Sequence, residues 1–187
     1  VTYNSRAVIG DALDEAEKAH QAGLLNVVIV DNVSKDGTVE FVREKYPWVN
    51  VIESPSNVGF GRGCNAGLAA AKTPYVLFLN PDAMLPTESL RTLLEFMEGH
   101  PKALFAAPAT ENYGGTELQA AGGLPTPWSL LRAAAGFPSH PRGRRDVQPG
   151  AAPFQTDWLG GGIMLGRCEE LRKLGGFDPR FFLYFEE

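Results

Sequence analysis

The chain has 187 residues, a length typical of one domain. Apolar residues make up 44% and charged residues 21%, a balance that excludes a disordered tail, a collagen-like repeat and a disulfide scaffold. The formal net charge is −5, which argues against a nucleic-acid partner because neutralising phosphates requires a basic face.

Apolar runs and helical periodicities alternate over the first half of the chain. Strands are predicted at 25–30, 48–53 and 75–79, and helices at 5–23, 36–46, 64–72 and 87–99. Ser5 is expected to cap the first helix, whose inward face would be Val8, Ile9, Ala12, Leu13 and Ala16. This alternation predicts an α/β fold with a mostly parallel, Rossmann-like sheet flanked by helices.

The alternation stops after residue 109. Residues 110–153 are rich in Gly, Pro, Ala and Arg, and 138–150 is expected to be an exposed, mobile loop. Residues 103–108 and 155–166 read as extended, and a short helix is predicted at 168–174. The first residues look like the end of a strand and the last stop without a tail, so we expect a single domain truncated at both ends.

Two cysteines, Cys64 and Cys168, show no metal-binding spacing and are expected to be reduced core thiols of a cytoplasmic protein. No apolar run approaches the ~18 residues of a membrane span, and no signal peptide is visible. The sequence therefore predicts no membrane span.

Polar residues follow each predicted strand. They are Tyr3-Asn4, Asp31-Asn32, Ser56-Asn57 and Asn80-Pro81-Asp82. Each alone is a common turn or helix cap. Because ligands of open α/β sheets bind beyond the carboxyl ends of the strands, the set together indicates a binding site.

The segments that carry these residues resemble a known family. They are VTYNS (1–5), VDNVSKDGT (30–38), NVGFGRGCNAG (57–67), LNPDA (79–83), and GGFD (175–178) followed by FFLYFEE (181–187). In this order they resemble family-2 glycosyltransferases of the GT-A fold, particularly the rhamnosyltransferase-like branch. The resemblance implies a nucleotide-binding half at 1–109 and an acceptor-side half at 110–187.

The resemblance also implies an activity: inverting transfer of a sugar from a nucleotide-diphosphate donor, such as dTDP-rhamnose or a UDP-sugar, to a glycan or lipid-linked acceptor. A departing diphosphate develops negative charge, which Mg²⁺ or Mn²⁺ neutralises. Asp82 matches the last position of the family's Asp-x-Asp signature and is the expected metal ligand, while Asn80 takes the first position. The alternative is that Asn80 to Asp82 only form a turn. The implied location is cytoplasmic, with peripheral association at the inner face of the membrane.

The donor would lie among residues that the resemblance assigns to nucleotide-sugar binding. Asp31 would hold the base or ribose, although it could instead cap the next helix. The remaining donor-site residues are Thr2, Tyr3, Asn4, Asn57, Gly59, Gly61, Asn65, Asn80 and Gly161. The glycine-rich run at 57–67 could place a diphosphate at a helix N-terminus, or it could simply turn tightly. Val33 occupies a position where relatives usually carry a small residue.

The general base is expected from the Glu186-Glu187 pair, where relatives carry Glu-Asp. Glu187 takes the Asp position, and its longer side chain shifts the carboxylate by about one bond. The alternative is that both are solvated terminal residues.

Two other functions compete with this interpretation. Residues 61–66 match G-x-G-x-x-A, which suggests an NAD(P)-dependent oxidoreductase, although 54–60 separate the first glycine from its strand. A non-catalytic nucleotide-sugar-binding module is the third possibility. Arg142, Arg144 and Arg145 could contact anionic lipid or donor phosphates, or simply be solvated.

Overall fold

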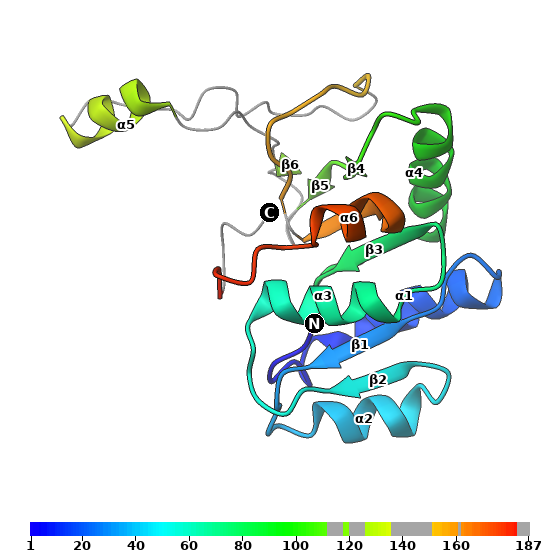
Figure 1. Ribbon diagram of the computed structural model, residues 1–187. Helices are drawn as coiled ribbons and strands as arrows, with labels where there is room; N and C mark the ends of the chain where they lie inside the picture. Colours follow the sequence, from blue (N-terminus) through cyan, green and yellow to red (C-terminus); the bar gives the residue numbers. More distant parts are fainter. Residues whose placement is uncertain (112–117, 120–125, 136–150, 161, 183–187) are drawn as a thin grey trace. The chain divides into compact units, whose positions relative to one another are not determined.

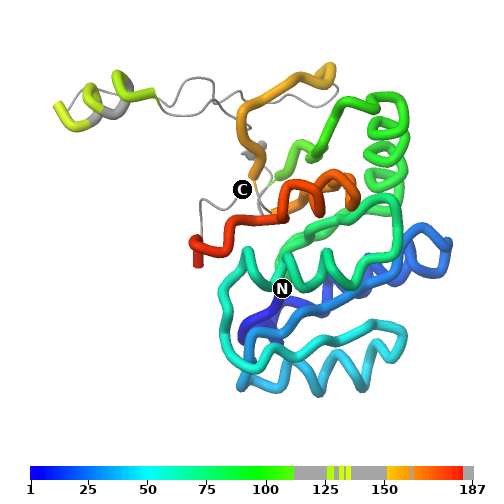
Figure 2. Tube along the Cα trace, viewed as in Figure 1, coloured from blue at the N-terminus to red at the C-terminus, as the bar shows by residue number. Residues whose placement is uncertain are grey.

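The computed structural model describes residues 1–111, 118–119, 126–135, 151–160 and 162–182 (Figure 1). The chain forms two compact units, one of residues 1–106 with 161–186 and the other of residues 107–160 with Glu187. Residues 162–182 therefore belong to the first unit, and their trace is drawn in orange to red in Figure 2.

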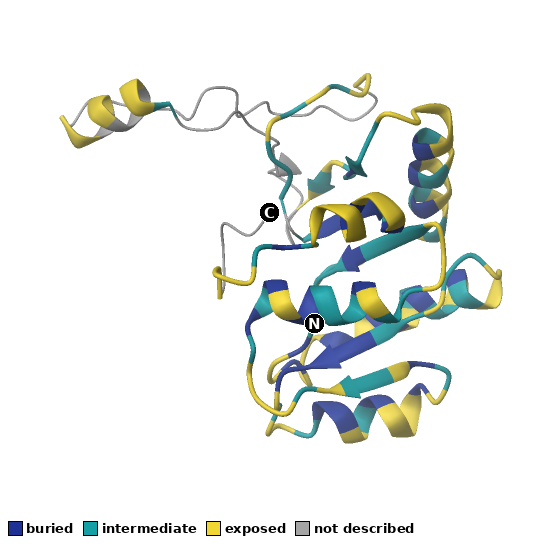
Figure 3. Ribbon diagram, in the orientation of Figure 1, coloured by how far each residue is buried: buried dark blue, intermediate teal, exposed yellow. Residues whose placement is uncertain are grey.

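The first part of unit 1 contains α1 (Ile9–Gln21), β1 (Val28–Asp31), α2 (Thr38–Lys45) and β2 (Asn50–Glu53). Strands β1 and β2 pair in parallel from Val28↔Asn50 to Asp31↔Glu53, and Thr2 forms a parallel bridge to Asp31. Side chains of α1, β1, α2 and the segment before β2 form one apolar core cluster, made of Ile9, Leu13, Ile29, Val42, Tyr46 and Val49. Figure 3 shows the buried positions along β1 and on one side of α2.

The remainder of unit 1 contains α3 (Phe60–Ala70), β3 (Tyr75–Leu79), α4 (Thr87–Gly99), β4 (Phe105–Ala106), β7 (Ile163–Arg167) and α6 (Cys168–Leu174). The strand order is β3-β7-β4, and β7 is antiparallel to both neighbours. A second core cluster joins this sheet to α4 through residues that include Leu90, Met97 and Leu165. Unit 2 contains β5 (Thr110–Glu111) and β6 (Leu118–Gln119), which pair antiparallel, and α5 (Pro127–Ala134).

The α/β prediction is confirmed, with β7 as an antiparallel strand that the alternation did not reveal. Strand 75–79 and helices 87–99 and 168–174 are also confirmed, with the predicted bounds. Helix α1 differs at its start. It begins at Ile9, Val8 is 44% exposed, and Ser5 provides no side-chain cap because its hydroxyl accepts a hydrogen bond from the Tyr3 amide.

Helix α3 begins at Phe60, four residues before the predicted start at Cys64. The longer helix includes Gly63, which packs directly against Val1. A Cβ at this position would lie 2.8 Å from the Cγ1 atom of Val1, so only glycine leaves room for this contact. At the other end of the helix, the Arg172 guanidinium of α6 donates hydrogen bonds to the carbonyls of Leu68 (2.8 Å) and Ala71 (2.5 Å). Thus α3 packs against the first residues of the chain and is capped by a late one.

Cys64 and Cys168 are buried and are not joined in a disulfide, as predicted, and burial raises the pKa of the Cys168 thiol. Within the described ranges, no helix is both long and apolar enough to cross a membrane. The loop predicted at 138–150 lies outside the described residues.

Candidate functional site at the strand ends

The carboxyl ends of three strands lie on one side of unit 1. Strands β1 and β2 are parallel, and Figure 1 shows the arrow of β3 pointing the same way. Asp31 ends β1, and Asn80 to Asp82 directly follow β3. The fold therefore places two of the predicted carboxylates at strand ends on one side of unit 1, one in each of two separate sheets.

Asp31 is a buried acceptor of three hydrogen bonds. Its side chain is part of a residue only 2% exposed, and its oxygens accept from Thr2 Oγ1 (2.8 Å), the Ser34 amide (2.8 Å) and Ser34 Oγ (2.5 Å). The alternative role as the cap of α2 does not hold, since Asp36 accepts from the Thr38 amide at 3.1 Å. A carboxylate offers about four lone-pair positions, so Asp31 keeps one beyond these bonds.

The three predicted donor residues at the start of the chain differ in their surroundings. Thr2 is 2% exposed, and its hydroxyl donates to Asp31 and so orients that carboxylate. Asn4 accepts from the Lys35 amide (2.8 Å) and donates its own amide to Ser34 Oγ (2.8 Å). Tyr3 is 56% exposed and is the one whose ring remains open to a ligand.

Ser34 is a hub that the sequence interpretation did not assign. It links Asp31 to Asn4, and it follows Val33, which has φ +65 and so adopts the left-handed region that β-branched residues avoid. A serine three residues after a strand-end aspartate is a side-chain turn pattern that could have revealed this contact.

Asn32 is the second unassigned residue. It is 3% exposed, its Nδ2 donates to the Gly59 carbonyl (3.1 Å), and its Oδ1 accepts from the Val58 amide (3.4 Å). Asn57 Oδ1 accepts from the Gly59 amide at 3.1 Å, so this predicted donor residue shapes its own turn. Asn32 and Asn57 together fix the loop between β2 and α3.

The first amide of helix α3 is occupied by the protein itself. The Phe60 N–H donates to the Phe182 carbonyl at 2.9 Å, and Gly59, at φ +86, lies so close to Phe182 that a Cβ would overlap it. The first N–H of α3 thus has a partner within the chain, and the diphosphate expected at this N-terminus stays a prediction. Gly61 is a buried position inside α3 and not part of a loop, which also removes the loop that the dinucleotide fingerprint requires.

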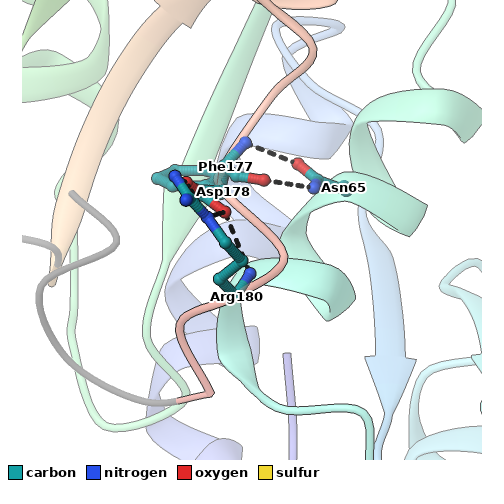
Figure 4. Close-up of polar contacts among 4 residues, drawn as sticks. All are labelled: Asn65, Phe177, Asp178 and Arg180. Carbon is teal, nitrogen blue, oxygen red and sulfur yellow. Dashed lines mark hydrogen bonds and ion pairs between the residues drawn. The ribbon is translucent and has the colours of Figure 1, made fainter.

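Asn65 has two partners in the C-terminal segment. Its Nδ2 donates to the Phe177 carbonyl and its Oδ1 accepts from the Phe177 amide, both at 2.8 Å (Figure 4). We call residues 176–182 the strap, because Arg62 Nε also donates to the Pro179 carbonyl (3.0 Å) and Phe60 bonds Phe182. The structure thus gives the Asn65 amide a protein partner where the sequence predicted a donor contact.

Asp178 of the strap is paired with Arg180, whose Nε lies 2.9 Å from Oδ2 (Figure 4). The hydrogen bonds from Arg180 lower the pKa of the Asp178 carboxyl to about 2. A cavity of about 460 Å³ is lined by residues 174–180, so it follows the strap and does not contain Asp31 or Asp82.

Asn80 and Asp82 form the turn after β3. The Asn80 amide donates to the Gly162 carbonyl (2.9 Å), and its carbonyl accepts from the Ala83 amide (3.1 Å). Asp82 is exposed and makes neither a hydrogen bond nor an ion pair with any described residue. These backbone hydrogen bonds therefore form the turn that the alternative interpretation expects. The turn does not use the Asp82 carboxylate.

The chemistry of this turn fits a hard divalent cation. Among the described residues no group of three or more His, Cys, Asp or Glu side chains could hold a metal. Mg²⁺ and Mn²⁺ in phosphate sites commonly use one or two protein carboxylates with phosphate oxygens and water. Asp82, with the neutral oxygen of Asn80, offers that donor set. The predicted residues Gly161, Glu186 and Glu187 lie outside the described residues.

Comparison with known proteins gives one family and several relatives. The family described as Glycosyl transferase family 2 matches residues 1–159. An N-acetylglucosaminyl-diphospho-decaprenol L-rhamnosyltransferase of Mycobacterium tuberculosis is 28% identical over 184 residues, 87% of this chain and 58% of the relative. The succinoglycan biosynthesis protein ExoO of Rhizobium meliloti is 33% identical over 94 residues, 50% of this chain and 27% of that protein. The chain thus spans little more than half of the mycobacterial relative.

Solved structures share the fold. The mannosyltransferase PcManGT of Pyrobaculum calidifontis, in complex with GDP-Man and Mn²⁺, has a TM-score of 0.58 at 23% identity, covering 95% of this chain and 46% of its own. S. aureus TarS 1–349 has a TM-score of 0.67 at 19% identity, covering 99% of this chain and 50% of its own. These similarities, which cover nearly the whole chain, show that it adopts the GT-A fold.

Proposed function

The chain belongs to glycosyl transferase family 2, and from that premise we propose that it transfers a sugar, with inversion, from a nucleotide-diphosphate donor bound at the ends of β1 and β3. The observation that carries the proposal is the Asp82 carboxylate, which is exposed at a strand end and has no partner among the described residues. A carboxylate kept free beside a turn that does not need it is available to a ligand.

The donor nucleotide would be bound mainly by residues at the end of β1. The exposed Tyr3 ring offers a flat surface to a base, and the remaining lone pair of Asp31 can accept an N–H or a ribose hydroxyl. Asn57 and Gly59 belong to the loop between β2 and α3. The hydrogen bond from the Asn4 amide to Ser34 joins the first residues of the chain to the turn after β1. Because Asp31 is held by three donors, it needs no rearrangement when the base arrives.

The diphosphate would lie at the end of β3. Mg²⁺ or Mn²⁺ held there by Asp82, with Asn80 beside it, would supply the charge neutralisation that a departing diphosphate requires. PcManGT in complex with GDP-Man and Mn²⁺ supports this choice of cation. Gly161, next to Gly162 whose carbonyl bonds Asn80, would approach the donor sugar.

The transfer step needs a base, and we assign it to Glu187 with Glu186 next to it. The Glu187 carboxylate takes the proton of an acceptor hydroxyl as its oxygen attacks C1 of the sugar. The new C–O bond forms on the face opposite the diphosphate. The bond to the diphosphate breaks with its electron pair going to the leaving oxygen, so the configuration at C1 inverts.

The relatives suggest the substrate class. The mycobacterial rhamnosyltransferase supports an activated rhamnose such as dTDP-rhamnose, and the TarS complexes with UDP and UDP-GlcNAc support a UDP-sugar. The decaprenol in the name of that rhamnosyltransferase supports a lipid-linked glycan acceptor. We propose that the protein acts at the cytoplasmic face of the membrane, in peripheral association with it.

The test is a thermal-shift series with UDP, dTDP and NADH, each in Mn²⁺ and in EDTA. A ligand at one hundred times its Kd stabilises the folded state by about 2.7 kcal/mol, and we expect that shift only for a diphosphate with Mn²⁺. Equal shifts in Mn²⁺ and EDTA would contradict the metal role. A shift with NADH and none with either diphosphate would favour the oxidoreductase.

A further inference from the structure

We infer that the cavity along the strap binds a neutral sugar ring of the acceptor glycan, with Arg180 donating hydrogen bonds to its hydroxyls and Leu174 contacting its apolar face. The inference rests on the proposed function, because it assigns the acceptor side of that reaction. The cavity has a volume of about 460 Å³ and is lined by residues 174–180. Pockets that hold small molecules commonly measure about 300–1,000 Å³.

Two glycines keep the base of the cavity free of side chains. Gly175 and Gly176 adopt the left-handed region, at φ +87 and +75, where other residues are rarely found. A Cβ at Gly176 would overlap Oδ1 of Asn65, whereas a Cβ at Gly175 would enter open space. The turn after α6 therefore presents bare backbone where other residues would place side chains, and this leaves room for a ligand.

Hydrogen bonds to helix α3 hold the strap, and with it the cavity, in place. The Asn65 side chain bonds both the N–H and the carbonyl of Phe177, at 2.8 Å each. Arg62 Nε donates to the Pro179 carbonyl at 3.0 Å. A site that is formed before its ligand arrives loses less free energy in ordering the chain on binding.

One ion pair forms the polar side of the cavity. Arg180 Nε donates to both oxygens of Asp178, at 3.0 and 2.9 Å, and Nη2 donates to Oδ2 (Figure 4). These bonds lower the pKa of the Asp178 carboxyl to about 2, so the pair stays ionised at neutral pH. They use two of the five guanidinium N–H groups and leave three for a ligand. The Arg180 side chain is 84% exposed, so these three can be reached.

The charge and the apolar surface of the cavity indicate the class of ligand. Among the described residues that line it, Asp178 and Arg180 are the only charged ones, and their charges cancel. A neutral pair gives a diphosphate no advantage, whereas N–H donors held in one plane suit hydroxyl oxygens. Leu174 is 68% exposed and adds an apolar wall. A pyranose matches this combination, because hydroxyls surround its rim and C–H bonds form its faces.

The strap contacts both parts of the proposed donor site. The Phe177 ring meets Phe78 of β3 edge-on, with centroids 5.0 Å apart, and β3 leads to the proposed metal ligand. The Phe182 carbonyl lies against Gly59, whose own carbonyl accepts from Asn32 Nδ2 at the end of β1 (3.1 Å). The cavity itself contains neither donor-site carboxylate. A sugar bound there would lie beside the donor, as an acceptor must.

The experiment is a titration of the full chain followed by amide NMR, with the methyl glycosides of glucose, N-acetylglucosamine and rhamnose as neutral probes. At least one probe should shift the backbone amide signals of residues 174–180 and leave those of β1 in place. In Arg180→Gln the Kd for that probe should rise about tenfold, because charged hydrogen bonds are lost. Leu174→Ser should also raise it. The Kd for UDP or dTDP in Mn²⁺ should stay within twofold in both variants.

Arg43→Gln is the matched control. Arg43 is also exposed and ion-paired, with Glu53 at 2.6 Å, and it belongs to α2 and not to the strap. This variant removes the same kind of surface ion pair, so its Kd for the glycoside should stay within twofold of the unsubstituted value. An equal rise of the Kd in Arg43→Gln and Arg180→Gln would overturn the inference.

Three other results would overturn it. They are strap signals that respond to none of the three glycosides, an unchanged Kd in Arg180→Gln and Leu174→Ser, and shifts at 174–180 that UDP with Mn²⁺ produces and the glycosides do not. Leu174→Ser carries the comparison alone if Arg180→Gln does not fold. A glycoside that binds at the strap while neither UDP nor dTDP binds would contradict the proposed function and support the sugar site alone.

Discussion

The ends of β1 and β3 each carry an aspartate, and the structure treats the two in opposite ways. Asp31 is almost fully buried and accepts three hydrogen bonds from Thr2 and Ser34. Asp82 is exposed and bonds no described residue. The first carboxylate is mostly used within the folded protein and keeps one acceptor position for the donor, whereas the second has no partner among the described residues. One half of the site is therefore preformed, whereas the other half depends on what binds there.

Replacing Asp31 should give the largest loss of stability. Asp31→Ala leaves the Thr2 hydroxyl and the Ser34 amide without their acceptor, and unsatisfied buried donors cost about 1–3 kcal/mol each. We expect the free energy of unfolding to fall by about 3 kcal/mol, measured by urea denaturation. A loss below about 1 kcal/mol would mean that Asp31 is not integral to the fold.

The turn beside Asp31 should become more stable when its strain is relieved. Val33 has φ +65, and such conformations cost about 1–3 kcal/mol. Val33→Asn, which tolerates this region, should raise the free energy of unfolding by about 1 kcal/mol. Val33→Ala is the control, because it removes the β-branch without the short polar side chain that lets Asn adopt this region, and it should gain less. Equal gains from both would show that the backbone is not the source.

Asp14 is hydrogen-bonded but exposed, unlike the buried Asp31. Its replacement therefore measures what hydrogen bonds contribute to stability without the effect of burial. The Tyr46 hydroxyl (2.5 Å) and then the Lys45 ammonium lower the pKa of the Asp14 carboxyl. A carboxyl whose pKa is lower in the folded state stabilises the protein above its unfolded pKa, near 3.9, and loses that contribution as the pH falls through its folded value. Asp14→Asn should therefore lose less than about 1 kcal/mol at pH 7.

The measurement is urea denaturation of both proteins across the acid range. The difference between Asp14→Asn and the unsubstituted protein should shrink below about pH 4 and vanish below the folded pKa. A difference that stays constant with pH would mean that the carboxylate charge contributes nothing.

Replacing Asp82 should change stability least and ligand binding most. Asp82→Asn removes no described contact, so the free energy of unfolding should change by less than about 0.5 kcal/mol. The Mn²⁺-dependent thermal shift with UDP or dTDP should disappear. Retention of that shift would place the metal elsewhere. The pair Asp31→Ala and Asp82→Asn thus tests whether stability depends on the end of β1 and metal-dependent binding on the end of β3.

Much of this contrast could be predicted from local sequence. Buried strands followed by Asp31 and by Asn80 to Asp82 predicted two carboxylates at strand ends, and both lie at strand ends, although β1 and β3 belong to two separate sheets. Helix α3 was predicted to begin too late, because glycines have low helix propensity and Gly61 and Gly63 suggested a loop. Tertiary packing overrides that preference, since Gly63 lies against Val1.

The contacts that join distant segments could not be predicted. Nothing near Asn65 indicates that its partner is Phe177, because the amide recognises backbone atoms that every residue carries. The direction of β7 was equally hidden, since an antiparallel strand that enters after 110–153 leaves no βαβ pattern. Ser34 and Asn32 are intermediate cases, as each lies within three residues of Asp31 and could have been read as a turn former.

The two caps of α3 have a consequence for how the protein is made. Its N-terminal amide bonds Phe182, and its C-terminal carbonyls bond Arg172, which lies 101 residues after Ala71. At about 5–20 residues per second, the ribosome delivers these partners roughly ten seconds after the helix itself. A short, glycine-containing helix is marginal in isolation. The nascent chain therefore carries an unfinished helix until translation has almost reached the end of this sequence, and chaperones would meet it in that state.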